Sequence, residues 1–317
     1  MYGKCGSITD AEAAFWMISK HDVVSWTSML SAYVEQGACE KALRLYRQMQ
    51  EEMVAMKDLM YVVTLQACGL LVEKEEAHKI EEKRVKAVVL LELVNALHRD
   101  ALRNGYGSEL IVRNTLVSVY GKCGAISQAE KVFRSMLVRD IISWNAMLSA
   151  YVDDRKAEKA LQLYRQMQQE GSRPEKLTFV MALQACAILA EKEGMISNGR
   201  STKEIALEIA KALHKDADMN GYTQDMIVGT TLLGVYGRCG EIMEAEDVFD
   251  GLLERNLVSW TAMLCAYVEQ GKAEKALLLY RHMRNNHEEM HLDSITFLCV
   301  LQSSGITGSL ELCEELH

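Results

Sequence analysis

The chain has 317 residues, of which 49% are hydrophobic and 25% charged, and its formal net charge is −9. No run of about 20 apolar residues occurs, so the sequence predicts no membrane-spanning helix. The nine cysteines include no CxxC pair, which argues against a zinc cluster or a disulfide framework and favours a reducing compartment. The acidic balance is unusual for a nucleic-acid-binding protein. Residues 284–317 account for much of it, because they hold one arginine against six acidic residues.

Residues 1–22 are predicted to be the end of a short helical unit. Their YGKCG block at Tyr2 recurs at Tyr120 and, as YGRCG, at Tyr236. Complete copies of this unit are expected at 110–140 and 226–256. The chain therefore opens inside a repeated block, which suggests a cut end. The absence of an Arg- and Ser-rich leader then says little about location.

A tryptophan-bearing unit follows each short unit, and its copies are expected at 23–57, 141–175 and 257–293. In the central copy, Trp144, Met147, Leu148 and Tyr151 have the spacing of one helical face. A polar break follows, and Ala160 begins a second stripe of the same kind. Two short amphipathic helices joined by a tight turn form a helical hairpin. Because such short helices are marginal alone in water, they must stack to bury their stripes.

A long unit comes next, with copies expected at 58–109 and 176–225 and a truncated third copy at 294–317. Its extra residues, 73–86 and 191–204, are rich in Glu and Lys. We expect a solvated helix extension at 73–86, where five glutamates are balanced by five basic residues, with a partner-docking surface as the alternative. Repetition at a nearly fixed period predicts one all-α solenoid over residues 1–317.

The repeated blocks are specific enough to carry a family resemblance. They read VYGKCG-x-I-x-x-A-x-x-VF, RDIISWNAMLSAYV, ALQLYRQMQQEG-x-x-P and LTFVMALQAC. Over its whole length the chain resembles the pentatricopeptide repeat proteins of land plants, in the subclass that alternates short, standard and long repeats. Its long units depart from the pattern, since they exceed the usual length by roughly 15 residues.

The resemblance implies a right-handed superhelical α-solenoid that binds single-stranded RNA and reads one base per repeat. It implies location in a mitochondrion or chloroplast and a role in RNA editing, processing, splicing or stability. RNA-editing or processing proteins would then act in trans, without any cofactor in this chain.

Two side chains per repeat read the base in such proteins, one early in the first helix and one at the end of the repeat. Carried over by motif, the pairs are Asn114 with Asp140, Thr230 with Asn256, Thr261 with Asp293, Asn145 with Glu175, and Thr27 with Lys57. Apolar wedges between bases are expected at Val24, Ile111, Ile142, Ile227 and Val258. Glu175 and Lys57 are not standard partners, and long units with Val62 or Val180 should read poorly.

No catalytic or metal-binding arrangement is predicted, and we do not expect an enzyme. His98 and His214 recur at equivalent places, which favours a structural role for both. The zinc-deaminase pattern H-x-E…P-C-x-x-C and the phosphate loop GxxxxGK[ST] are absent from the sequence.

Two other functions remain open. The acidic balance favours a protein–protein interaction scaffold, and the position of both ends inside repeats favours a repeat fragment without independent function. Uncapped terminal repeats also predict self-association.

Overall fold

The computed structural model describes residues 7–73, 80–192, 200–286 and 293–308, with the backbone alone for 80–87. The first helices are α1 (Ile8–Trp16), α2 (Val23–Glu35), α3 (Cys39–Glu51), α4 (Asp58–Glu73), α5 (Ile80–Arg103), η2 (Tyr106–Ser108), α6 (Leu110–Lys122), α7 (Ile126–Arg134) and α8 (Ile141–Asp153). The others are α9 (Ala157–Gln169), α10 (Lys176–Glu191), α11 (Thr202–Met219), α12 (Met226–Cys239), α13 (Ile242–Gly251), α14 (Leu257–Glu269), α15 (Ala273–Asn286) and α16 (Ser294–Thr307). Within these ranges no strand occurs, which confirms the predicted all-α class.

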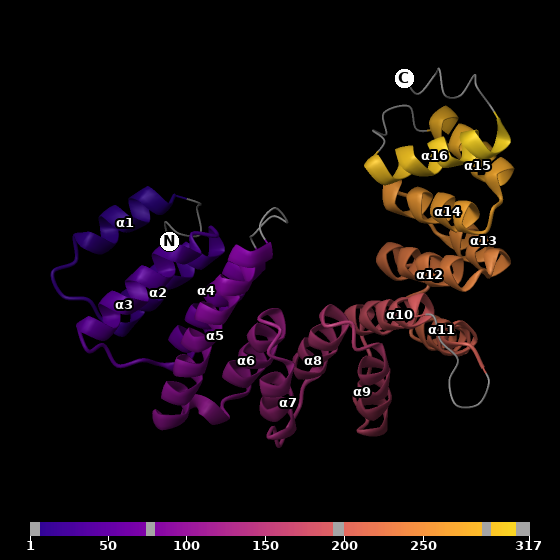
Figure 1. Cartoon of the computed structure of the whole chain (residues 1–317). Coiled ribbons are helices and arrows are strands. Elements are labelled where there is room, and N and C mark those ends of the chain that lie inside the picture. Colours follow the sequence, from indigo (N-terminus) through magenta and orange to yellow (C-terminus); the bar gives the residue numbers. More distant parts are fainter. Residues whose placement is uncertain (1–6, 74–79, 193–199, 287–292, 309–317) are drawn as a thin grey trace. The chain divides into compact units, whose positions relative to one another are not determined.

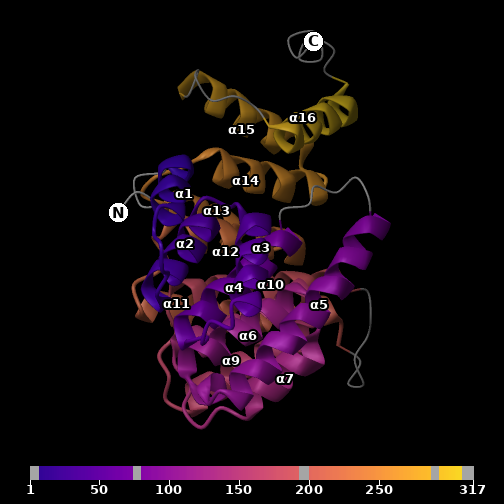
Figure 2. The ribbon, with the colours of Figure 1, turned by 90° about the vertical axis from the view of Figure 1, so that its left-hand side faces the viewer.

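The helices form two compact units, residues 1–154 and 155–317 (Figure 1). In each unit the first helices of successive hairpins contact one another in a row. The row is α2, α4, α6 and α8 in the first unit and α10, α12, α14 and α16 in the second. At the C-terminal end, α16 packs on both α14 and α15 (Figure 2). The predicted stacking of hairpins is confirmed within each unit, whereas the right-handed superhelical course and the repeat boundaries stay predictions.

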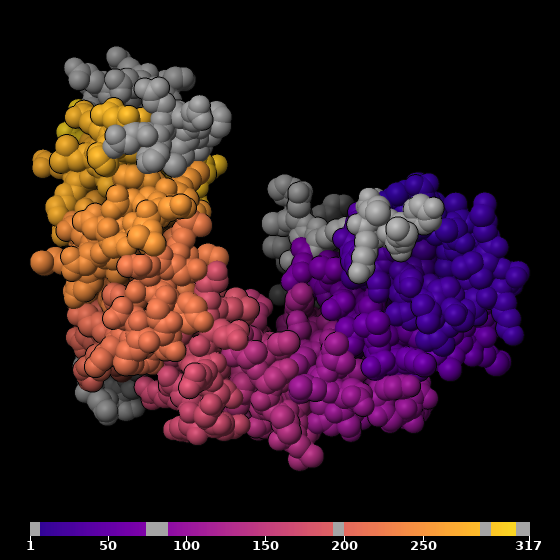
Figure 3. Space-filling view, turned by 180° about the vertical axis from the view of Figure 1, so that it is seen from behind, coloured from indigo at the N-terminus to yellow at the C-terminus, as the bar shows by residue number. Residues whose placement is uncertain are grey.

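Equivalent tryptophans form the core of the hairpin stacks. Trp26, Trp144 and Trp260 are at most 2% exposed. Each meets the edge of a phenylalanine ring from the preceding short unit, with ring centroids 5.1, 5.1 and 4.9 Å apart. Such contacts add about 0.5–1.5 kcal/mol to the burial of the rings. The apolar stripe predicted from Trp144 to Tyr151 is buried. Figure 3 shows one outer face of the molecule, coloured by residue number.

Two glycines set the distance between successive first helices. A Cβ on Gly121 would lie 2.6 Å from the Cβ of Ala150, and a Cβ on Gly237 would lie 2.7 Å from the Cβ of Ala266. Neither distance is compatible with a real Cβ. The first glycine of the YGKCG and YGRCG blocks therefore holds α6 against α8 and α12 against α14.

The charged extensions of the long units are only partly described, because residues 74–79 and 193–199 lie outside the described ranges. At the described ends, Glu73 pairs with Lys122 at 2.9 Å and Glu191 pairs with Arg238 at 3.1 Å. These carboxylates thus contact cations of the following first helix.

Two histidines make the same contact in both units. His98 Nδ1 lies 3.0 Å from Tyr120 Oη, and His214 Nδ1 lies 2.9 Å from Tyr236 Oη. Both side chains are half-buried, and this burial lowers the pKa of each imidazole. Their recurrence at equivalent places supports the structural role predicted for both.

Gly237→Ala should lower the free energy of unfolding by about 1–3 kcal/mol, because the added methyl overpacks the contact between α12 and α14. Gly234 in the same helix is the matched control, since its nearest neighbour is an Arg238 nitrogen at 3.7 Å. Gly234→Ala should raise the free energy of unfolding by about 0.5–1 kcal/mol through helix propensity. Urea unfolding measures both, and equal stability of the two variants would contradict the close approach.

The histidine contacts predict a dependence of stability on pH. A lowered pKa in the folded state means that the unfolded chain binds protons more readily, so stability is full above the unfolded pKa of about 6.5. It should decline as pH falls through that value toward the lower folded pKa. In urea unfolding between about pH 7 and about pH 5, the His98→Gln/His214→Gln variant should lose less stability than the wild type. An unchanged loss would show that other groups cause it.

Candidate nucleic-acid interface

The predicted site residues lie at the starts of the first helices. Counted from the first helical residue, the wedges occupy position 2 and the first member of each pair occupies position 5. The second member is the residue that caps the next first helix. Because successive first helices contact one another within each unit, position 5 of one helix comes close to the start of the next helix in that unit.

The five predicted wedges are exposed aliphatic side chains. Val24, Ile111, Ile142, Ile227 and Val258 are 50–69% exposed. Helices α4, α10 and α16 carry exposed aliphatic residues at the same position, namely Leu59, Leu177 and Ile295. Our sequence analysis missed these three, although aligning the blocks LMY, KLT and SIT with the other helix starts would have found them. Every first helix in the described ranges thus presents an apolar group in its first turn.

Asn114, Asp140 and Ser143 form one closed hydrogen-bond cluster, the Asn114 triad. Asn114 Nδ2 donates to Asp140 Oδ1 at 3.0 Å, and Ser143 Oγ donates to Asn114 Oδ1 at 2.7 Å. Ser143 Oγ also lies 2.8 Å from Asp140 Oδ1, which accepts the Ser143 backbone N–H at 2.8 Å and so caps α8. The predicted pair is therefore in contact, and Asn114 is only 7% exposed.

Thr261, Thr296 and Asp293 form a hydrogen-bond chain at the start of α16, the Thr261 chain. The hydroxyls of Thr261 and Thr296 are 2.6 Å apart, and Thr296 Oγ1 donates to Asp293 Oδ1 at 2.6 Å. Asp293 Oδ1 also accepts the Thr296 backbone N–H. The predicted pair is thus joined through a third residue that the sequence analysis did not name.

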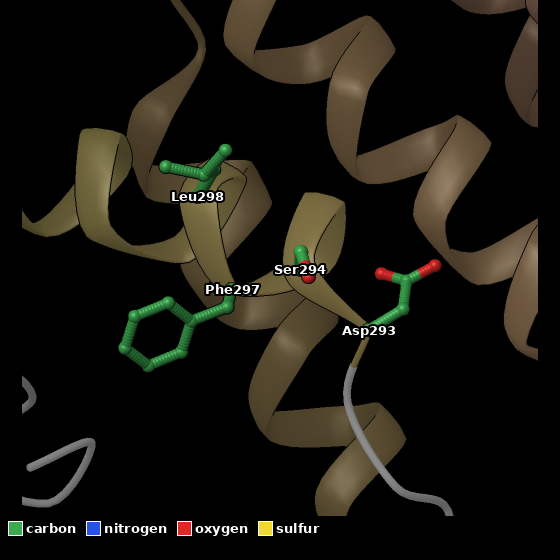
Figure 4. A pocket seen from close by; sticks show the side chains of 4 residues that line it. All are labelled: Asp293, Ser294, Phe297 and Leu298. Atoms are coloured by element: carbon green, nitrogen blue, oxygen red, sulfur yellow. The ribbon is translucent and has the colours of Figure 1, made fainter. Parts of the chain in front are cut away.

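A shallow pocket lies at the same helix start. It is lined by Asp293, Ser294, Phe297 and Leu298 (Figure 4). The Asp293 carboxylate and the Phe297 ring point to opposite sides of this helix start. An acceptor and an apolar surface therefore flank one opening.

Two further pairs, Thr230 with Asn256 and Thr27 with Lys57, make their hydrogen bonds elsewhere within the described ranges. Thr230 donates to the Met226 carbonyl at 2.6 Å, while Asn256 Oδ1 accepts the Ser259 backbone N–H at 2.9 Å. In the N-terminal pair, Thr27 donates to its own helix and Lys57 is exposed.

Asn145 and Glu175 belong to different units and are described singly. Asn145 is half-buried, and Glu175 is an exposed residue that caps α10. In the long units, Val62 and Val180 are buried at position 5.

The hydrogen bonds hold two of the carboxylates ionised. Burial favours the neutral form of Asp140, but hydrogen bonds from Ser143 and Asn114 outweigh it and lower the pKa of that carboxyl. Hydrogen bonds from the Thr296 hydroxyl and backbone lower the pKa of Asp293 in the same way. At neutral pH both groups act only as acceptors.

Family models match the same segments that carry these contacts. The PPR repeat model matches residues 24–54, 111–141, 230–257 and 258–287, and the PPR repeat family model matches 139–188. The chain belongs to the pentatricopeptide repeat family.

Pentatricopeptide repeat-containing protein At4g18520, chloroplastic, of Arabidopsis thaliana is 32% identical over 317 residues, which are 100% of this chain and 45% of that protein. At4g25270, chloroplastic, of the same plant is 30% identical over 100% of this chain and 53% of its own length. This pentatricopeptide repeat chain thus spans about half the length of these two relatives, or less.

Among solved structures, the crystal structure of the pentatricopeptide repeat protein PPR10 in complex with an 18-nt psaJ RNA element matches 99% of this chain and 52% of that one. Its TM-score is 0.45 and its identity is 16%.

Within the described ranges, His, Cys, Asp and Glu side chains form no group of three or more that could hold a metal ion. No helix there has both the length and the apolar character needed to cross a membrane.

The dual position of Asp140 predicts two different outcomes for two substitutions. Asp140→Ala should lower the free energy of unfolding by about 1 kcal/mol, because α8 loses its cap. Asp140→Asn should stay within a few tenths of a kcal/mol of the wild type, because asparagine caps helices equally well and Asn256 already caps α14. Urea unfolding measures both variants. Equal losses for Ala and Asn would show that capping is not what Asp140 contributes.

Proposed function

We propose that this chain binds single-stranded RNA in a sequence-specific manner, with one base facing each repeat. The observation that carries the proposal is the Asn114 triad beside an exposed wedge, because it places an amide and a carboxylate next to an apolar surface that can stack on bases. Membership of the pentatricopeptide repeat family supports it. Polar groups beside a stacking surface can read the edges of unpaired bases, which is how proteins recognise single-stranded RNA.

The direction of each hydrogen bond determines what a site offers to a base. Asn114 Oδ1 accepts from Ser143 and its Nδ2 donates one hydrogen to Asp140, so the amide keeps one N–H to donate. Asp140 offers acceptor lone pairs. One donor beside one acceptor complements uracil, which presents O4 and N3–H. The family's correspondence assigns the same base to an Asn and Asp pair.

The two threonine sites differ in their second member. Thr230 gives its hydrogen to Met226, so it can accept from a base, while Asn256 uses its oxygen at Ser259 and keeps its amide donors. An acceptor beside a donor complements adenine, which presents N6–H and N1. The family resemblance assigns adenine to a pair of Thr and Asn, and this arrangement of acceptor and donor fits that base.

In the Thr261 chain the carboxylate can only accept. Thr296 therefore donates to Asp293, and Thr261 donates to Thr296. Thr261 and Asp293 then both present acceptors, which complement N1–H and N2–H of guanine. With Asn145 favouring a pyrimidine and the long unit unassigned, repeats 110–293 should prefer 5′-U-Y-N-A-G-3′.

We place this binding in an organelle, in support of RNA editing, processing, splicing or stability. Relatives named chloroplastic support an organellar site without choosing between chloroplast and mitochondrion. In this proposal the chain locates a transcript, and any chemistry on the RNA belongs to proteins that act with it.

A protein-interaction scaffold is the second candidate. Two observations favour it, the net charge of −9 and the exposed leucines at equivalent turns, Leu137 and Leu253, which are 99% and 78% exposed. The RNA-binding experiment below separates the two functions.

The double variant Thr230→Asn/Asn256→Asp should convert the preferred base at its repeat from adenine to uracil. The new amide supplies a donor and the new carboxylate an acceptor, as in the Asn114 triad. Each good base-specific contact discriminates by about 1–3 kcal/mol. Fluorescence anisotropy with single-stranded RNAs that differ only at the fourth base of 5′-UCAAG-3′ measures the change.

Preferences at the first and fifth bases serve as internal controls and should not move. If neither protein discriminates between bases at any position, sequence-specific RNA binding is wrong and the scaffold is favoured. If the swapped protein still prefers adenine, the assignment of this pair is wrong.

A further inference from the structure

Asn114 and Thr261 are two position-5 residues that lie against side chains at the next helix start, and they contact the same kind of neighbour. Ser143 and Thr296 occupy position 3 of the following first helix, and neither has any exposed surface. Each hydroxyl lies within hydrogen-bonding distance of the position-5 side chain of the preceding repeat and of the capping carboxylate of its own helix. The position-3 hydroxyl therefore lies between the two members of the pair.

This hydroxyl has a function that capping alone does not require. Asp140 caps α8 through the Ser143 backbone N–H, which any residue at position 143 except proline would supply. The hydroxyl accepts the Asp140 backbone N–H at 3.2 Å in a capping box, and it also donates to Asn114 Oδ1, an oxygen on a side chain that is 7% exposed. A buried acceptor without a donor is costly. Without Ser143 the amide is held only by its Nδ2 bond to Asp140, so it turns its oxygen outward more readily, although Asp140 still opposes that turn.

The orientation of that amide determines which base fits. With the oxygen held inward, the outward group is an N–H, which complements O4 of uracil. With the oxygen outward, the site would accept from the N4 amino group of cytosine. Uracil and cytosine differ at this edge by the exchange of donor and acceptor.

The chain contains a natural contrast. Ser259 is position 3 of α14, is equally buried, and lies beside the cap Asn256. Its hydroxyl donates to the Asn256 carbonyl at 2.9 Å, while Thr230 donates to its own helix. At this junction the equivalent serine and the position-5 threonine each donate to a backbone carbonyl of their own helix start.

We propose that the position-3 hydroxyl, Ser143 or Thr296, is a third specificity-determining residue that orients the base-facing side chain of the preceding repeat. It is a positioning residue, because it acts through Asn114 or Thr261 and does not touch the base itself. This inference rests on the proposed RNA binding and adds a residue from the next repeat to each such site.

The test uses the full chain and single-stranded RNAs that carry 5′-UCAAG-3′ or 5′-CCAAG-3′. Ser143→Ala should lower the ratio of uracil to cytosine affinity roughly fivefold, the effect of one neutral hydrogen bond. Ser143→Thr should restore the ratio, because threonine occupies the same position in α10 and α16. Ser259→Ala, the matched control, should leave this ratio unchanged. Urea unfolding of all three variants checks that each is folded.

The outcomes are distinguishable. If the wild type prefers uracil and Ser143→Ala keeps the full ratio, the positioning role is wrong while RNA reading stands. If Ser259→Ala lowers the ratio as much as Ser143→Ala, the effect is general loosening and the proposal is again wrong. If the wild type does not distinguish the two RNAs, the proposed reading fails at its best-defined site, and the positioning role fails with it.

Discussion

A hydrogen bond between a capping side chain and the backbone N–H at position 3 begins each of the first helices α8, α14 and α16. The residue that caps a first helix is also the last residue of the repeat before it. Asp140 and Asp293 each accept this bond at 2.7–2.8 Å, and Asn256 accepts it at 2.9 Å. One side chain therefore begins a helix and closes the pair that faces the proposed RNA. Folding and recognition depend on the same atoms.

Apolar packing between the helices places the helix starts at regular intervals, so the same residue both caps a helix and completes a predicted pair at several junctions. Tryptophans against phenylalanine edges hold each hairpin on its neighbour, and glycines at Gly121 and Gly237 let successive first helices approach closely. Because these contacts repeat at equivalent positions, the spacing between helix starts repeats as well. A regular row of exposed position-2 residues and of predicted pairs follows from apolar packing, although none of these residues takes part in the ring and glycine contacts.

The sequence predicted the hairpins because apolar stripes at helical spacing can be buried in only one way. The family resemblance implied apolar wedges at position 2, and the five residues named there are 50–69% exposed. The sequence did not show that Asn114 and Thr261 are 7% exposed, because burial there depends on how closely the next helix approaches.

For the same reason the contribution of Ser143 and Thr296 was missed. The D-x-x-S and D-x-x-T spacing indicates a cap. Sequence spacing does not show which side chain of the preceding repeat the hydroxyl contacts, because that contact depends on how the two helices pack. The pairing of Asn145 with Glu175 lies between the two units and stays a prediction.

The sharing of one residue between cap and reader restricts how such a protein can change its target in evolution. Only a few residue types cap helices well, chiefly Asp, Asn, Ser and Thr. A change from Asp to Asn alters the polarity offered to a base while the helix start survives, so it carries almost no folding penalty. A change to a larger or apolar residue weakens the fold before it creates a new preference. New base preferences should therefore arise first by exchange of aspartate and asparagine at the capping position. The set of residues available for base recognition is then limited by helix capping as much as by the chemistry of RNA.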